Sequence, residues 1–424
     1  MLKGFSNEKW IVGYDLGWEY AQISYCNAAR TQVETLSLVA GSENYSIPVV
    51  LAKRVGVNQW FYGKEALRYA QESGGILVRD LLRLALDGEP VLIEETEYDP
   101  VALLTLFFQR SLGMLSGIAL ADKIEAMMIT CDRMDESMTE MLQKVAANLR
   151  LKTGKIYFQS HQESYYYYML RQSADLWKDP SVLFDYHGNR MGFLRLECNR
   201  KTQPVTVFIR QEEEEFPARA SLSGDGQGDL LLDREFMKVV REKLGEDKFS
   251  SVYLIGEDFS EEWLKSSLKF LCEGRRIFLG NNLFSKGACY GMLERFTPGE
   301  NAGKYVFLGN DKLKSNIGMK IRRRGEETYL ALLDAGNSWK KAGTTWEFYL
   351  REEKKVELTI TSLSSGRKWD VPIVLEQLPG DIARIRMTIC MKEENLLEAE
   401  FEDLGFGEYR PAENRCWTQE IRID

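Results

Sequence analysis

Two acidic turns in this sequence carry residue types that could hold a phosphate and its metal ion. Asp15 and Gly17 follow a first apolar run, and Asp185 and Gly188 follow a second one. A glycine at a turn lets backbone N–H groups approach a ligand closely, and a carboxylate beside them can bind a hydrated cation. Asp at a hairpin turn more often caps only its own backbone, so neither turn alone indicates a ligand site. The repetition of the pattern predicts a magnesium-phosphate site in which both aspartates contact the metal through water.

Each acidic turn is expected to connect the two strands of a β-hairpin. The first hairpin is predicted over Trp10–Tyr25 and the second over Ser181–Leu196, because an apolar run precedes each turn and another follows it. The two aspartates are about 170 residues apart in the chain. We therefore expect two similar subdomains that face each other across a cleft.

The order of the predicted elements divides the chain into an α/β part and an all-β part. Strands and helices alternate through residues 1–300, which indicates a covered sheet. Beyond residue 300, short β-type runs are separated by Gly, Asn and Pro signals, and no helix is expected. The 424 residues also exceed the usual size of a single core. We predict a nucleotide-binding-type domain over 1–300, with subdomains of roughly 1–180 and 181–300, and a β-sandwich over 301–424.

The composition excludes several classes of function. A net charge of -9 argues against sequence-independent nucleic-acid binding. No apolar run is long enough to span a bilayer, and the N-terminus carries no signal-peptide core, so the cytoplasm is the expected compartment. The seven cysteines include no CxxC pair and are interpreted as reduced thiols. Two histidines are too few for a three-histidine zinc centre, which leaves carboxylates and backbone groups to carry any chemistry.

The acidic turns belong to a longer series of motifs. They lie within IVGYDLG and FDYHGNR, and VYLIGEDFSEEW and KGACYGML follow them along the chain. Near the end comes LPGDIARIRMTICMKEENLLEAEFEDL, a pair of predicted strands. In this order, the series resembles the phosphate hairpins, the adenosine-site strand, the nucleotide-closing segment and the peptide-binding β-sandwich of the actin-like ATPase superfamily, and most of all the seventy-kilodalton heat-shock chaperones of the DnaK type. The resemblance covers nearly the whole chain.

The resemblance implies a two-lobed actin-like ATPase fold of the α/β class, followed by a C-terminal all-β sandwich. It implies ATP or ADP with magnesium as the cofactor, and a polypeptide or protein as the partner. It also implies catalytic candidates, which are Asp15, Arg79 and Asp185, because Arg79 stands nearest to the family's catalytic lysine. The retained nucleotide-binding positions would be Asp15, Gly17, Asp185, Gly188, Gly256, Gly287 and Ala288.

The sequence departs from the family's pattern at most of the phosphate contacts. Trp18 and Glu19 replace two hydroxyl residues of the first hairpin, and a carboxylate about 4 Å from a phosphate oxygen repels it by roughly 1 to 4 kcal/mol. The second hairpin lacks two of the family's three glycines and its threonine, although Arg190 could supply a compensating charge. Glu257 replaces a glycine of the adenosine strand, and Glu163 is only a loose counterpart of the metal-positioning glutamate. These departures predict a degenerate nucleotide site.

Three functions remain open at this point. The leading hypothesis is a non-catalytic or weakly nucleotide-binding scaffold protein whose sandwich engages a polypeptide. The first alternative is a divergent but active chaperone-like ATPase in which Arg79 and Arg190 replace the lost phosphate contacts. The second alternative is a filament-forming actin relative, which would self-associate. Neither nucleic acid nor a membrane is expected among the partners.

Overall fold

The computed structural model divides the chain into two compact units. The first unit contains Met1–Glu197 together with Ile209–Ala302, and the second contains Cys198–Phe208 together with Gly303–Asp424. The sequence predicts that the N-terminal segment carries no signal-peptide core. Most of that segment, residues 1–8, lies outside the described residues. The structure describes residues 9–27, 32–117, 123–149, 151–222, 226–351, 354–376, 378, 381–412 and 415–423.

The first predicted hairpin is present in the first unit. It consists of β1 (Trp10–Leu16) and β2 (Tyr20–Asn27), which pair antiparallel. On its other side β1 pairs in parallel with β10 (Ile124–Cys131), which in turn pairs with β11 (Ile156–Ser160). Most of β1 is buried, as expected for a central strand whose two faces are both covered. Asp15 therefore lies near the carboxyl end of a central strand.

The second predicted hairpin has the same surroundings in another six-stranded sheet. It consists of β12 (Ser181–His187) and β13 (Arg190–Asn199), and β14 (Val205–Glu215) extends the sheet beyond β13. On its other side β12 pairs in parallel with β15 (Ser251–Ile255), followed by β16 (Arg276–Leu279). Asp185 thus occupies a position in β12 that corresponds to that of Asp15 in β1.

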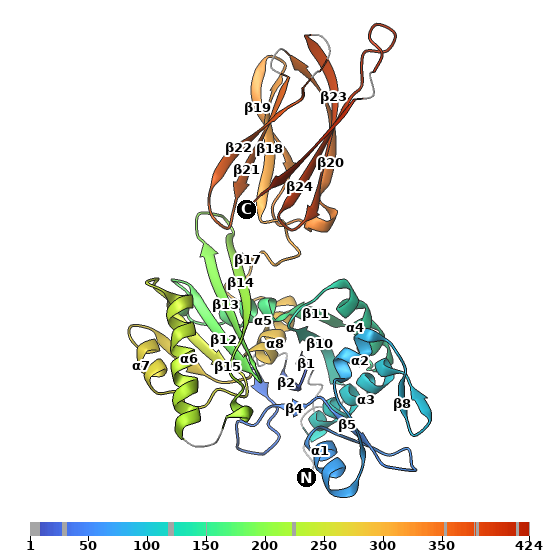
Figure 1. Ribbon diagram of the computed structural model, residues 1–424, viewed down its shortest axis with the longest axis vertical. Helices are drawn as coiled ribbons and strands as arrows, with labels where there is room; N and C mark the ends of the chain where they lie inside the picture. The colour runs from blue at the N-terminus through green and yellow to red at the C-terminus, as the bar shows by residue number, and fades with distance from the viewer. Residues whose placement is uncertain are drawn as a thin grey trace. The chain divides into compact units, whose positions relative to one another are not determined.

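Two helices pack together next to these sheets. They are α5 (His161–Leu170) and α8 (Leu283–Phe296), which lie side by side (Figure 1). A Cβ atom added to Gly287 would lie 2.0 Å from the carbonyl oxygen of Ser164, so the two helix backbones touch at this point. A Cβ atom added to Gly13 would lie 2.4 Å from a backbone nitrogen of α8, so α8 also rests directly on β1.

The other elements of the first unit surround these sheets and helices. No helix in the described part of the chain is long and apolar enough to cross a membrane. The remaining elements are β3 (Glu34–Thr35), β4 (Ile47–Pro48), β5 (Leu51–Lys53), β6 (Trp60–Tyr62), α1 (Gly63–Ser73), β7 (Ile76–Val78), α2 (Leu81–Asp87), β8 (Val91–Ile93), β9 (Thr96–Tyr98), α3 (Pro100–Gly113), α4 (Glu136–Asn148), α6 (Gly226–Leu244) and α7 (Ser266–Leu271).

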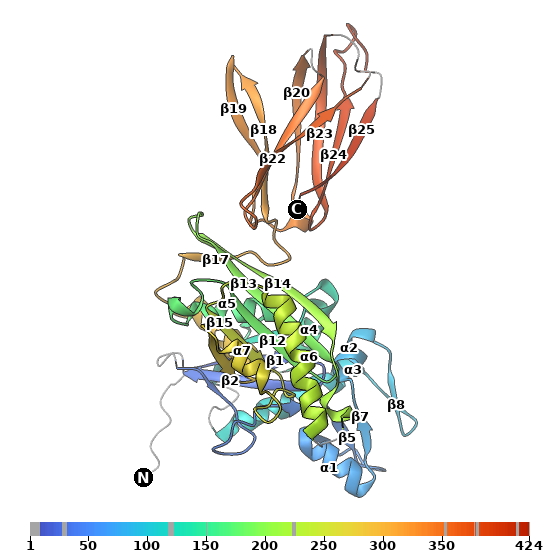
Figure 2. The same ribbon diagram turned by 60° about the vertical axis from the view of Figure 1, so that its left-hand side comes forward.

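The second unit is rich in β-structure. Two four-stranded antiparallel sheets form its separate layers (Figure 2). Buried side chains from both sheets, such as Ile360 and Met387, share one hydrophobic core. The first sheet has the order β19-β18-β21-β22 and the second has the order β20-β23-β24-β25. The strands of these two sheets are β18 (Ser315–Arg323), β19 (Glu326–Leu333), β20 (Gly343–Arg351), β21 (Lys355–Ser362), β22 (Lys368–Val374), β23 (Ile382–Glu393), β24 (Leu396–Asp403) and β25 (Cys416–Arg422). The short strand β17 (Tyr305–Phe307) precedes them in the chain and belongs to neither sheet.

The two-lobed actin-like ATPase fold expected from the sequence is wrong for this chain. The first unit is mixed α/β, and its strands are divided among several sheets of different size. Residues 1–180 and most of 181–300 fall within one compact unit instead of two lobes. The physical reason is the packing of α8, which touches the backbone of α5 at Gly287 and the backbone of β1 at Gly13 and so joins these elements in one unit. The expected β-rich C-terminal region is present.

Candidate functional site

The first candidate aspartate forms an ion pair with a histidine from a distant part of the chain. Asp15 Oδ1 lies 2.7 Å from Nε2 of His161, the first residue of α5. The imidazole ring stacks on the ring of Phe284 in α8, with centroids 3.9 Å apart and planes 8° from parallel. Both partners of the ion pair are largely buried. The carboxylate that the sequence assigned to a metal is therefore paired with a histidine of the protein.

The electrostatics of this pair favour the charged form of His161. Burial alone would lower its pKa, but the charge of Asp15 and the hydrogen bond to it, with smaller contributions from Asp132 and Asp185, raise the pKa above its ordinary value. Because Asp185 contributes, the second hairpin lies within electrostatic reach of the first. An imidazolium beside a carboxylate is a satisfied pair with no remaining charge to attract a cation.

The second candidate aspartate repeats this pairing within its own strand. Asp185 Oδ1 lies 2.8 Å from Nε2 of His187, and no regular hydrogen bond from the described residues reaches this oxygen, so the contact is an ion pair. Residues 185 and 187 are two apart in β12 and therefore lie on the same face of the strand. Burial lowers the pKa of His187, but its interaction with Asp185, and more weakly the charges of Glu257 and Asp15, raise the pKa to about 9. At neutral pH this ring is protonated.

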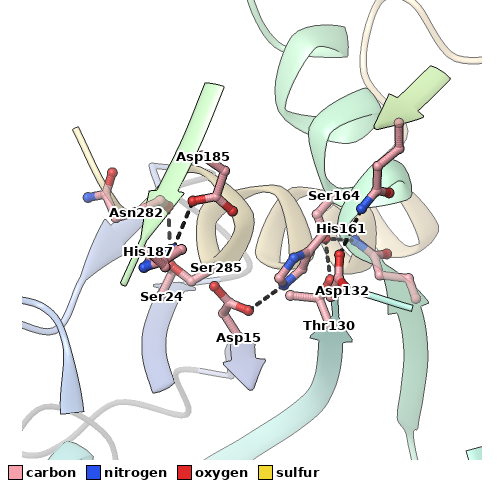
Figure 3. A network of polar contacts seen from close by, with 12 residues as sticks. Asp15, Ser24, Thr130, Asp132, His161, Ser164, Asp185, His187, Asn282 and Ser285 are labelled. Atoms are coloured by element: carbon pink, nitrogen blue, oxygen red, sulfur yellow. Dashed lines mark hydrogen bonds and ion pairs between the residues drawn. The ribbon is translucent and has the colours of Figure 1, made fainter. Parts of the chain in front are cut away.

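We call Asp15, His161, Asp185 and His187 the hairpin network. Figure 3 shows the two aspartates and the two histidines near one another, with each histidine joined to one aspartate. The structure thus brings both predicted metal-binding residues into one site. It also adds a cationic partner for each of them.

The backbone amides of the two turns are also paired within the protein. The N–H of Gly17 donates to the carbonyl oxygen of Tyr20 at 2.9 Å. The N–H of Gly188 donates to Oδ2 of Asp258 at 2.6 Å. In the second turn, a carboxylate oxygen therefore occupies the hydrogen-bonding position that a phosphate oxygen would need.

Glu257, which replaces a glycine of the expected adenosine strand, is bound from two sides. Its Oε1 accepts a hydrogen bond from Asn281 Nδ2 at 2.7 Å and another from the hydroxyl of Ser46. Ser46 in turn accepts a hydrogen bond from Gln22 in β2 at 3.0 Å. This chain of contacts connects the end of β15 with the first sheet by direct hydrogen bonds.

The remaining predicted nucleotide positions serve packing within the protein. Gly256 has a φ of +107°, and a Cβ atom there would lie 2.2 Å from the carbonyl oxygen of Tyr186, so only glycine fits. Gly287 lets α8 touch α5, as described above. Ala288 is fully buried in an apolar cluster that includes Ile11 and Met292. For Gly256 and Gly287, the close approach that the sequence predicted is present, but the approaching group is protein backbone.

The expected catalytic and compensating groups lie elsewhere or have other partners. Arg79 is exposed just after β7. Arg190 is paired with Glu213 at 3.1 Å, and both side chains are exposed. Glu163 forms the capping box of α5, in which its carboxylate accepts a hydrogen bond from the Ser160 N–H and its own N–H donates to the Ser160 hydroxyl. Glu163 therefore positions a helix end.

The residues of the site, as they are arranged, do not fit a magnesium nucleotide. The two carboxylates and the two turn amides each have an internal partner, so a metal-phosphate group would first have to displace these partners. In the described part of the chain, no group of three or more His, Cys, Asp or Glu residues is placed to hold a metal ion. Binding of ATP or ADP through Asp15 and Asp185 stays a prediction.

Sequence reasoning set the two histidines aside, although they are central to the site. A local signal existed for His187, because Asp-x-His in a strand places an acid and an imidazole on one face. No such signal existed for His161, which is 146 residues from Asp15. Only the tertiary packing, in which α8 contacts both α5 and β1, reveals that pair.

The fold and the site define a mixed α/β unit with an internally paired aspartate-histidine network, followed by a β-rich unit. Comparison with family models agrees with this division. The C-terminal model of a family of unknown function, DUF5716, matches residues 32–310, and the chain belongs to this family. A domain of unknown function, DUF8552, matches residues 312–423. Neither description is that of an actin-like ATPase, which agrees with the correction of the fold. No curated protein matches the chain.

Proposed function

We propose that this chain is a non-catalytic scaffold protein that binds a polypeptide, and that its hairpin network stabilises the first unit without a nucleotide. The observation that carries the proposal is the internal pairing of the candidate ligand groups. Each aspartate is paired with a histidine. The amide of Gly188 is paired with the carboxylate of Asp258.

The energetics favour the internal pairs over a bound phosphate. Removing one partner of a buried ion pair costs about 3–5 kcal/mol, and the Asp15–His161 pair is largely buried. A phosphate at the second turn would also approach the carboxylates of Glu257 and Asp258, and each charge at about 4 Å adds roughly 1–4 kcal/mol of repulsion. Ligands of micromolar to millimolar affinity supply only about 4–8 kcal/mol. On this estimate, a nucleotide binds weakly or not at all.

The polypeptide partner is supported by the edge strand β20 of the second unit. β20 lies at the end of its sheet order and exposes Trp346 and Tyr349, whose side chains are 40% and 62% exposed. Edge strands of soluble proteins commonly carry Pro or Lys that prevent further pairing. β22, another edge strand, contains Pro372, whereas β20 contains neither residue type. The other two edge strands, β19 and β25, also lack Pro and Lys, so the exposed rings of Trp346 and Tyr349 are what favour β20 as the strand that accepts an extended peptide.

The compartment and the excluded partners form part of the same proposal. We assign the protein to the cytoplasm because no disulfide joins the seven cysteines of the described residues, including the two exposed ones, Cys272 and Cys416. The net charge of -9 supports a protein partner and not a nucleic acid. We propose no membrane partner.

One observation favours the alternative of a divergent ATPase. Asp15 and Asp185 lie in the same network (Figure 3), which is the arrangement that a metal-nucleotide site would require. In this alternative, magnesium and the triphosphate displace both histidines. The aspartates would then contribute to nucleotide binding more than to the stability of the ligand-free protein.

Thermal unfolding with and without millimolar MgATP separates the two functions. The variants are Asp15→Asn and Asp185→Asn, and the matched control is Asp87→Asn, which alters an exposed ion pair with Arg83. We expect MgATP to leave the Tm of the wild type unchanged. We expect Asp15→Asn to lower the stability by about 3–5 kcal/mol whether or not MgATP is present, because the largely buried His161 loses its charged partner. The control should match the wild type.

The opposite pattern would refute the scaffold proposal. A rise in the wild-type Tm with MgATP that disappears in Asp15→Asn would assign the network to nucleotide binding. ATP turnover that both aspartate variants abolish would have the same meaning.

A further inference from the structure

Two buried thiols lie in contact outside the hairpin network. Cys289 Sγ lies 3.6 Å from Cys26 Sγ and donates a hydrogen bond to it. Cys26 belongs to β2 and Cys289 to α8, and both are buried. The two residues are 263 positions apart in the chain, so their contact is a product of the fold.

The elements that carry these thiols hold them rigidly. α8 packs on β1 without an intervening side chain, since a Cβ atom at Gly13 would lie 2.4 Å from the nitrogen of Cys289. The surrounding side chains are apolar and include Ile11, Ala126 and Met292. A sulfur–sulfur bond is about 2.05 Å long, so the two sulfurs need to approach each other by roughly 1.5 Å. Rotation of the two cysteine side chains is the movement that the proposed bond requires.

The two thiols differ in reactivity. The hydrogen bond from Cys289 lowers the pKa of Cys26; burial opposes this effect, and the charge of Arg171 adds to it. Burial, followed by the interaction with Cys26, raises the pKa of Cys289 well above its ordinary value. Because the thiolate is the nucleophile, Cys26 is suited to attack an oxidant first. Cys289 keeps its proton until it attacks the oxidised sulfur of Cys26, and it gives that proton to the departing hydroxide.

We propose that Cys26 and Cys289 form a modification site, a thiol pair that a small neutral peroxide converts into an intramolecular disulfide. The Cys26 thiolate attacks one peroxide oxygen, the O–O bond breaks, and the hydroxide that leaves takes up a proton to become water. Cys26 is then a sulfenic acid. The sulfur of Cys289 attacks this sulfur, the S–S bond forms, and the S–O bond breaks with release of a second water. Two thiols lose two electrons and two protons, and one peroxide is reduced to two waters.

Burial limits which oxidants can reach the thiol pair, and the disulfide that forms changes the stability of the fold. A small neutral molecule reaches the pair through local opening, whereas a bulky charged disulfide such as oxidised glutathione is excluded from two thiols that are 1% and 0% exposed. The product joins β2 to α8 across a very long loop. A cross-link of this kind restricts the unfolded chain and raises the stability of the folded state.

Oxidation with hydrogen peroxide followed by mass spectrometry tests the proposal. The protein carries Cys272→Ser and Cys416→Ser, which remove the exposed thiols. We expect a loss of two hydrogens per chain, a peptide cross-link between Cys26 and Cys289 under non-reducing digestion, and a higher Tm that returns to its starting value with dithiothreitol. In the same background, Cys26→Ala and Cys289→Ala should each lack the cross-link and the Tm change. The cross-link is mapped in the protein that retains Cys26 and Cys289, so this part of the test does not depend on whether the two alanine variants fold.

Two results would overturn the proposal. In the first, peroxide treatment gives sulfinic acid at Cys26 or no change at either residue, with no cross-link at any peroxide concentration that preserves the fold. In the second, the cross-link joins another pair of cysteines in equal yield.

Discussion

His187 is the residue whose chemistry depends most clearly on a single neighbour. The charge of Asp185 opposes the effect of burial and raises the pKa of the imidazole to about 9. We predict that Asp185→Asn lowers this pKa to its ordinary value of about 6.5 or below it, because the effect of burial is then opposed only by the weaker charges of Glu257 and Asp15. Titration of the imidazole proton resonances by NMR measures it directly. The chain has only two histidines, so His161→Gln identifies the remaining signal. If the pKa of His187 is unchanged in Asp185→Asn, the ion pair does not determine the protonation of His187.

The same pair makes stability depend on pH in a defined direction. A histidine whose pKa is higher in the folded protein stabilises it fully below the unfolded-state pKa of about 6.5, and this stabilisation is lost as the pH rises through about 9. The side chain of His187 is 47% exposed, so solvent screening limits the effect to about 1 kcal/mol. The difference in Tm between the wild type and His187→Gln should therefore shrink between pH 6.5 and pH 9.

At the scale of elements, α5 packs closely against α8 because Gly287 has no side chain. We predict that Gly287→Ala lowers the stability by about 1–3 kcal/mol, because the new Cβ atom would lie 2.0 Å from the Ser164 carbonyl oxygen and the helices would have to separate. Gly113→Ala in α3 is the matched control, since a Cβ atom there meets nothing within 4 Å. Chemical denaturation measures both free energies of unfolding. Equal values for the two variants would mean that the helices are not in contact at Gly287.

Gly287 also shows what the sequence alone can predict and what it cannot. A glycine at such a position predicts a close approach, and the structure contains that approach, but the sequence does not say whether the neighbour is a ligand or backbone. The two acidic turns could be predicted because each is encoded within a few consecutive residues. The partners of those turns could not be predicted, since His161 reaches Asp15 only through the packing of α5, and Asp258 reaches Gly188 only through β15. The expected actin-like fold was wrong for the same reason, because local motifs do not determine how sheets are joined.

At the scale of the whole molecule, the proposed function assigns stability to the first unit and recognition to the second. Cross-strand ion pairs of Glu347 with Arg384 and Arg386 hold β20 to β23, so the edge strand is fixed in register before any partner arrives. An extended peptide that pairs with β20 would bury the exposed rings of Trp346 and Tyr349. Aromatic side chains buried in this way commonly contribute 2 kcal/mol or more to binding, by order of magnitude about a thirtyfold change in affinity.

We therefore predict that peptides selected against the wild-type chain from a display library lose at least about tenfold in affinity for Trp346→Ser. The matched control is Tyr409→Ser, because Tyr409 is 94% exposed in the same unit but lies outside the strands. Calorimetric titration of each selected peptide gives the Kd for the wild type and both variants. A selection that yields no peptide above background, or peptides that bind Trp346→Ser and Tyr409→Ser equally well, would exclude β20 as the recognition strand, and the scaffold proposal would then lack a binding surface.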